Sequence, residues 1–148
     1  MELHFGQVVI PYSNGQLSSD VARYLENDYG LTEVFVKTKK QLIEQQYILA
    51  ILDMLNDAIH GVPIHPDKNI AFGKVNTATT QMRRDMLNKR EYDGLIHGVP
   101  TLRAEMGVSL RFKSGFTTAK VKGKKIRISR PSFIDTHLYL NSMITWLE

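Results

Sequence analysis

The chain has 148 residues, a net charge of +4, 43% hydrophobic residues and 23% charged residues, values ordinary for one globular domain, so we expect residues 1–148 to fold as a single domain. It contains no cysteine, which excludes disulfides, zinc–thiolate sites and thiol catalysis and favours the cytoplasm. No apolar run reaches the roughly 20 residues of a membrane span, and residues 1–4 do not resemble a signal peptide, so we expect no membrane contact.

The first 36 residues predict two short strands around one helix. A strand is expected over residues 5–11, which end on a proline. A helix is expected over residues 18–29, capped by one of its first serines and stopped by Gly30. The β-branched and aromatic residues 34–36 then predict a second strand.

A long helix is predicted over about residues 39–60, and Gly61 with Pro63 ends it. Its apolar residues recur at helical spacing and form one stripe, which we expect to be buried in the core. These residues are Ile48, Ile51, Leu52, Leu55 and Ile59. A second helix is expected over about residues 76–93, and a single helical turn over residues 101–106.

The last third changes to the period of a strand. Residues 108–113 alternate between apolar and polar, and residues 117–122 and 125–130 predict a hairpin that turns near Gly123. A final helix is expected to begin at Asp135 or Thr136, with an apolar stripe of Leu140, Met143, Ile144 and Leu147. The predicted fold class is therefore α+β, with N-terminal helices and short strands, then an antiparallel β meander and a C-terminal helix.

The sequence shows no familiar catalytic, nucleotide-binding or metal-binding motif. His60, His65 and Asp67 lie close together in sequence, but their spacing matches no known metal-binding pattern. His60 and His97 each precede a helix-ending glycine, where a histidine interacts favourably with the helix dipole. We therefore expect no catalytic residue, no cofactor and no metal.

The charge is distributed unevenly. Between Glu105 and Asp135 there are eight basic residues and no acidic one, whereas the rest of the chain holds 11 basic and 15 acidic residues. This basic segment predicts a surface for DNA or for another anionic partner. The alternative is that its lysines protect an exposed sheet edge. The eight residues are Arg111, Lys113, Lys120, Lys122, Lys124, Lys125, Arg127 and Arg130.

The segment over residues 130–142 contains Asp135-Thr136-His137-Leu138, followed by Ser142. It resembles the Asp-Thr-Gly-x-Leu-x-x-Ser type of motif in small tail-completion and head–tail joining proteins of tailed bacteriophages, with His137 in place of the glycine. The resemblance implies a structural virion protein that assembles in the host cytoplasm. It would form a ring in the phage neck, bind other virion proteins and enclose passing DNA.

Two aromatic residues of the expected last helix, Tyr139 and Trp146, are predicted to contact another chain, because aromatic residues are enriched at interfaces. We therefore expect a homo-oligomer, and the sequence does not specify its number of subunits. Two other functions stay open: a sequence-nonspecific nucleic-acid-binding module acting as a monomer or dimer, and a small enzyme with an unfamiliar site. The mass of the native assembly and the salt dependence of DNA binding distinguish these functions.

Overall fold

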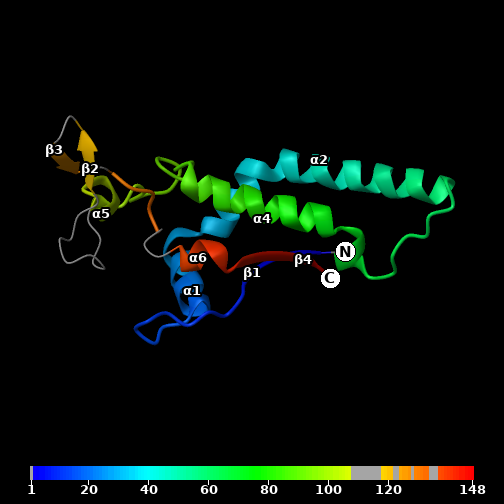
Figure 1. Ribbon diagram of the computed structural model, residues 1–148, viewed down its shortest axis with the longest axis horizontal. Coiled ribbons are helices and arrows are strands. Elements are labelled where there is room, and N and C mark those ends of the chain that lie inside the picture. The colour runs from blue at the N-terminus through cyan, green and yellow to red at the C-terminus, as the bar shows by residue number, and fades with distance from the viewer. Residues whose placement is uncertain (1, 108–117, 122–123, 128, 134–136) are drawn as a thin grey trace.

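The computed structural model describes residues 2–107, 118–121, 124–127, 129–133 and 137–148. Its helices are α1 (Ser18–Tyr29), α2 (Leu31–Ile59), α3 (Lys68–Ala71), α4 (Gly73–Asn88), α5 (Leu102–Glu105) and α6 (Leu138–Asn141); its strands are β1 (Leu3–Gln7), β2 (Thr118–Val121), β3 (Lys124–Arg127) and β4 (Met143–Leu147). The described part is elongated, with α2 and α4 along the long axis. The β2–β3 hairpin lies at the end opposite the tip of α2 (Figure 1).

The beginning and the end of the described chain meet in an antiparallel ladder. β1 pairs with β4, from Leu3 opposite Leu147 to Gln7 opposite Met143, and α4 packs against β4. The second ladder joins β2 to β3. The described elements therefore confirm the α+β class, with two two-stranded ladders in place of a longer meander. The strand predicted over residues 108–113 lies outside the described residues.

The strand predicted over residues 34–36 is wrong, because these residues belong to α2. Gly30 adopts a left-handed φ of +59°, which ends α1 in the geometry that glycine favours. Helix α2 begins at the next residue, Leu31. Phe35 is fully buried and meets Phe5 edge to face, with ring centroids 5.7 Å apart. Burial of this face outweighs the modest preference of β-branched residues for strands.

The predicted C-terminal helix is also wrong. Helix α6 is a single turn, and the chain then continues as β4. The spacing from Leu140 to Leu147 fits a helix, but Met143, Thr145 and Leu147 are buried while the residues between them are more exposed. That alternation has the strand period of two. Its cause is the pairing with β1, which lies at the other end of the sequence and is invisible to local periodicity.

Several other expectations are confirmed within a few residues: the helix over residues 18–29, the second long helix as α4, and the hairpin. Ser18 does not cap α1, however. Its hydroxyl donates to the carbonyl oxygen of Val8 at 2.7 Å and accepts from the Ile10 amide at 2.9 Å, which ties the helix to the preceding loop. The core lies where α1, α4, the first half of α2 and the β1–β4 ladder meet, and includes Leu25, Leu31, Phe35, Ile43, Met86, Leu87, Tyr92, Tyr139, Leu140 and Met143.

Candidate interaction surfaces

The apolar stripe on the second half of α2 is exposed, contrary to the prediction that it is buried. Ile48, Leu52, Leu55 and Ile59 are 57, 56, 53 and 82% exposed. Residues 44–59, which we call the arm, extend beyond the start of α4 (Figure 1). Together with one exposed neighbour, Leu49, the predicted stripe forms an apolar surface that we call the outer face: Ile48, Leu49, Ile51, Leu52, Leu55 and Ile59.

A second apolar stripe begins just before the arm and continues along it, and this stripe is partly covered. Ile43, Tyr47, Ala50 and Met54 follow one another at intervals of four, three and four residues, the same spacing as in the set Ile48, Leu52, Leu55 and Ile59. At 3.6 residues per turn, the two stripes lie about 140° apart around the helix. Ile43 is buried and the other three are half-buried. The Tyr47 ring lies 5.7 Å from that of Phe72.

Sequence reasoning identified one stripe and missed the other. The missed signal was the repetition of apolar residues on both sides of the helix, which is typical of a helix covered on both sides. In the described part of the chain, the second stripe, from Ile43 to Met54, faces the loop that joins α2 to α3. A cavity of about 150 Å³ between them is lined by Met54, Asp57, Pro63, Ile64, His65 and Ala71.

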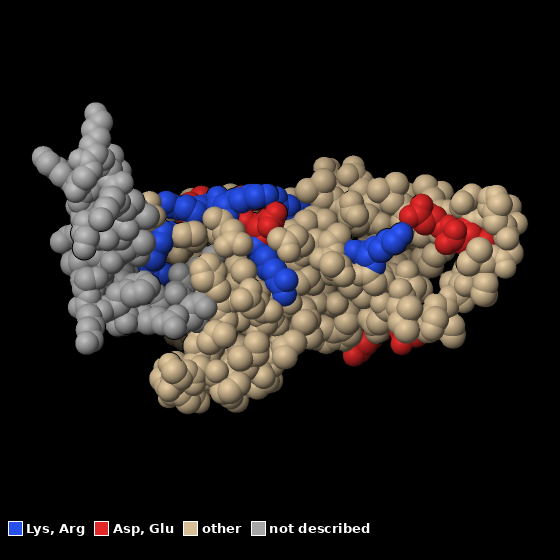
Figure 2. All heavy atoms as spheres, viewed as in Figure 1, with Lys and Arg blue, Asp and Glu red and all other residues tan. Residues whose placement is uncertain are grey.

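The charge around the arm is negative. Residues 41–67 contain four carboxylates and neither lysine nor arginine. Figure 2 shows acidic side chains near the tip of the arm. The four are Glu44, Asp53, Asp57 and Asp67.

The β2–β3 hairpin, which carries part of the basic segment, lies at the end of the molecule opposite the tip of the arm (Figure 1). Within the hairpin, Lys120 is paired with Lys125, and Thr118 with Arg127. The backbone register therefore opposes two lysine positions of the basic segment. Arg111, Lys113 and Lys122 lie outside the described residues.

The base of the hairpin is tied to the helical body. The guanidinium of Arg90 donates to Ser129 Oγ at 2.7 Å, and the amide of Arg130, which is half-buried, donates to the carbonyl oxygen of Ala104 at 3.0 Å. These contacts hold the chain that follows β3 against α5 and against the turn after α4. They fix where the hairpin leaves the body.

Tyr139 and Trp146 occupy different environments. Tyr139 is 4% exposed, so its side chain is part of the core and offers no surface to another chain in this arrangement. Burial raises the pKa of its hydroxyl, as it does for Tyr92. Trp146 is half-buried on β4, and its contact with another chain stays a prediction.

The core near Tyr92 and Tyr139 also contains a buried arginine, Arg83. Arg83 is 4% exposed; its Nη2 donates to Thr32 Oγ1 at 3.1 Å, and its guanidinium lies 5.8 Å from the centre of the Phe5 ring. A buried cation is costly unless polar groups and aromatic faces surround it. These contacts satisfy only part of the guanidinium, because Arg83 Nε and Nη1 are buried without a hydrogen-bond partner among the described residues.

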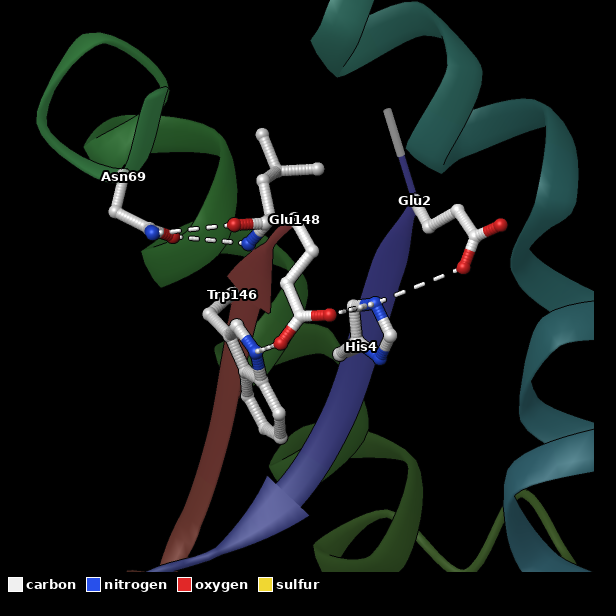
Figure 3. Close-up of polar contacts among 6 residues, drawn as sticks. Glu2, His4, Asn69, Trp146 and Glu148 are labelled. Carbon is white, nitrogen blue, oxygen red and sulfur yellow. Dashed lines mark hydrogen bonds and ion pairs between the residues drawn. The ribbon is translucent and has the colours of Figure 1, made fainter. Parts of the chain in front are cut away.

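A polar cluster joins the two ends of the described chain (Figure 3). The His4 ring stacks on Trp146 with centroids 5.4 Å apart. His4 Nε2 lies 3.5 Å from a carboxylate oxygen of Glu148 and 3.9 Å from one of Glu2. These contacts draw together side chains from β1 and from the end of β4, and so reinforce their pairing.

The outer edge of β4 is covered by side chains. Asn69 accepts from the amide of Leu147 at 2.9 Å and donates to its carbonyl oxygen at 3.1 Å (Figure 3). Arg84 donates to the carbonyl oxygens of Leu140, Asn141 and Met143, each at 3.1 Å. A groove of about 310 Å³ lies between these two anchors, along α4. Such capping discourages the addition of a further strand.

No metal centre is found among the described residues: no group of three or more histidine, aspartate or glutamate side chains is arranged to hold an ion. His60 Nδ1 lies 2.8 Å from the carbonyl oxygen of Asn56, and His65 Nδ1 accepts from the amide of Asp67 at 3.0 Å. Both rings thus contact nearby backbone. In the same part of the chain, none of the helices has the length and apolar character needed to cross a membrane.

Comparison with known proteins gave no match: no family model, no curated protein and no solved structure is similar to this chain.

Proposed function

We propose that this chain is a structural subunit of a homo-oligomer, and that the oligomer is a head–tail joining or tail-completion ring in the neck of a tailed bacteriophage. The observation that carries the proposal is the outer face of the arm. Six large apolar side chains are exposed there in succession. Scattered exposed apolar residues are normal, but a contiguous apolar patch marks an interaction site.

The energetics favour covering this face. Burying a leucine or isoleucine side chain completely contributes about 1.5–3 kcal/mol relative to full exposure. The outer-face residues already have part of their surface covered, so each gains a fraction of that amount. Six such gains on one helix add in the same direction and oppose the entropy cost of association.

The phage setting is supported by the resemblance over residues 135–142 and by the basic segment. A ring around passing DNA benefits from cations that meet phosphates without reading the base sequence. Such a protein would assemble in the host cytoplasm, bind neighbouring virion proteins and remain in the virion. It would need no catalytic residue and no cofactor.

The test is the native mass of the protein at micromolar concentration. We expect the wild type to form one defined oligomer and Leu52→Glu/Leu55→Glu to be monomeric, because each carboxylate would be buried without a partner. A matched control replaces two exposed leucines outside the arm, Leu95→Glu/Leu102→Glu, which are 55 and 70% exposed, and should retain the oligomer. A wild type that is monomeric both alone and in particles from its source would refute the proposal.

A second function, sequence-nonspecific nucleic-acid binding, is favoured by the register of the hairpin, which opposes Lys120 to Lys125. Phosphates would relieve the repulsion between such cations. Binding of a monomer to random duplex DNA, with unchanged mass across concentrations, would favour this function over the ring.

A further inference from the structure

We propose that the outer face of the arm binds the same face of a second copy of this chain, with the two arms antiparallel. This inference rests on the proposed oligomer and names the contact that holds it: two arms related by a two-fold axis. The residues that carry it lie in α2 and in the loop after it, all of which the structure describes.

The spacing of the outer face is that of a helix that packs along another helix. Ile48, Leu52, Leu55 and Ile59 follow one another at intervals of four, three and four residues. This is the alternation of the two seam positions in a pair of packed helices. Each of the four side chains is more than half exposed, so the seam has room for a second helix.

The positions beside the seam carry no charge. At 100° per residue, Leu49 and Asn56 lie on one side of it and Ile51 and Ala58 lie on the other. Leu49 and Ile51 are themselves exposed and widen the apolar contact. A partner with charged groups along its contact face would bury those charges unpaired here. A second arm brings a face that is equally apolar and uncharged.

The carboxylates of the arm do not oppose this contact. Asp53 and Asp57 lie about 130° and 170° around the helix from the middle of the seam, at 100° per residue. Asp57 lines the cavity between the arm and the loop, on the side away from the outer face. Glu44 precedes the first residue of the seam. Two outer faces can therefore meet without bringing carboxylates together.

Charge favours antiparallel arms over parallel ones. The tip of the arm is acidic, with Asp53, Asp57 and Asp67, and residues 41–67 contain no lysine or arginine. Parallel arms would place two acidic tips side by side. Antiparallel arms place the tips at opposite ends of the seam, and the partial charge at the end of each helix then lies near the opposite partial charge of the other.

The antiparallel arrangement also fixes which residues meet. The spacing of four, three and four residues is the same when it is read in either direction. Ile48 of one arm therefore lies opposite Ile59 of the other, and Leu52 lies opposite Leu55. Both copies use the same residues in the same way, as a two-fold contact requires.

The size of the contact determines the kind of assembly. At 1.5 Å per residue the arm is about 24 Å long, and a helix is about 10–12 Å wide, so each arm covers a strip of about 250 Å². A standard interface buries about 800 Å² per partner, so further contacts must join one arm pair to the next. Those contacts engage two chains at a time and gain avidity from the pair. The oligomer therefore contains an even number of chains.

Disulfide trapping tests the contact, because the chain has no cysteine of its own. Ile48→Cys and Ile59→Cys are prepared separately and mixed in equal amounts under mild oxidation. The mixture should give disulfide-linked pairs on a non-reducing gel, and neither variant should do so alone. The antiparallel arrangement puts two copies of one site about 16 Å apart, whereas a disulfide needs Cα atoms within about 7 Å.

The control is a mixture of Leu95→Cys and Leu102→Cys, two exposed positions outside the arm, which should stay unlinked. Circular dichroism checks that each variant folds. If either arm variant does not fold, Leu52→Glu/Leu55→Glu is mixed with Leu52→Lys/Leu55→Lys instead. Each of these should be monomeric alone, and their mixture should contain pairs, because opposite charges then meet across the seam.

The other outcomes separate this contact from the proposed function. Linked pairs in each arm variant alone would show parallel arms and overturn the antiparallel contact. Unlinked chains in every sample, beside an oligomeric wild type, would show that the arm binds a different surface and would leave the oligomer standing. An odd number of chains in the native mass would overturn the two-fold contact. A monomeric wild type would refute both proposals.

Discussion

The two halves of α2 belong to one continuous helix but have different surroundings. In the first half, Leu31, Phe35 and Ile43 are buried among α1, α4 and β1. In the second half, the stripe from Tyr47 to Met54 is half-buried, whereas the stripe from Ile48 to Ile59 is exposed. An apolar stripe therefore indicates that burial of that face is favourable. The rest of the chain determines whether this burial occurs within one molecule. The half that is left uncovered is the place to look for a partner.

The largest expected loss of stability is in the first half of α2. Phe35→Ala should lower the free energy of unfolding by about 3–5 kcal/mol, because it removes a fully buried ring and leaves a cavity beside Phe5. Chemical denaturation monitored by circular dichroism measures the change. Leu42→Ala, an exposed position of the same helix, is the control and should lose much less. Similar losses for both variants would show that the two faces are equally packed.

The next-largest loss of stability depends on pH and concerns Tyr92, whose side chain contacts the first half of α2. Burial raises the pKa of Tyr92, and its hydroxyl donates to the carbonyl oxygen of Leu31 at 3.2 Å. The raised pKa contributes stability that is fully present below the unfolded value of 10.0 and is lost as pH rises above it. Above pH 10, each further pH unit should cost up to about 1.4 kcal/mol for this group.

Tyr92→Phe tests this dependence. The variant should be less stable at pH 7, because the Leu31 carbonyl loses its donor, but its stability should fall less steeply between pH 10 and pH 11.5. The measurement is the urea midpoint across that interval. Tyr24→Phe is the control: this tyrosine is exposed and its pKa is raised chiefly by its hydrogen bond with Asp28, so the variant should change the slope less than Tyr92→Phe does. An unchanged alkaline slope in Tyr92→Phe would show that Tyr92 is not protected from ionisation by the fold.

The elements of secondary structure show which features the sequence could predict and which it could not. The bounds of α1 follow from Gly30 and its neighbours within a few residues, and the hairpin follows from alternation around a glycine. Such features depend on local chain chemistry and were predicted correctly. The strand β4 depends on β1, more than 130 residues away by the pairing of Gln7 with Met143, and periodicity pointed to a helix instead.

The outer face of the arm was also predicted only in part, because its exposure depends on the whole fold. The stripe from Ile48 to Ile59 was identified from its spacing, but its burial was inferred from the assumption that a strong apolar stripe faces its own core. The stripe from Ile43 to Met54 has identical spacing. Only the position of Phe72 and of the loop before α4 decides which of the two is covered, and that position is a property of the whole fold.

A smaller effect is expected in the arm. Leu52→Ala should change the free energy of unfolding of the monomer by less than about 1 kcal/mol, because the side chain is already 56% exposed and little of the roughly 2–5 kcal/mol of a buried leucine is at stake. Leu31→Ala, the same substitution at a buried position of the same helix, should cost several times more. Denaturation at a concentration where the protein is monomeric makes the comparison. A loss of 2 kcal/mol or more in Leu52→Ala would show that the arm is covered within one chain.

The smallest effect on stability is expected at the opposite end, in the basic segment. Replacing Lys122, Lys124, Lys125 and Arg127 with serine should leave the melting temperature within a few degrees, because cations that are close in sequence and have no carboxylate between them repel one another. The same variant should lose DNA affinity and its salt dependence. Each phosphate contact contributes roughly 0.9 log unit of affinity per log unit of salt, so losing the contacts flattens the slope. Fluorescence anisotropy with a random duplex from 50 to 200 mM salt measures it, and a variant with an unchanged slope would assign these cations to protein contacts or to protection of the sheet edge.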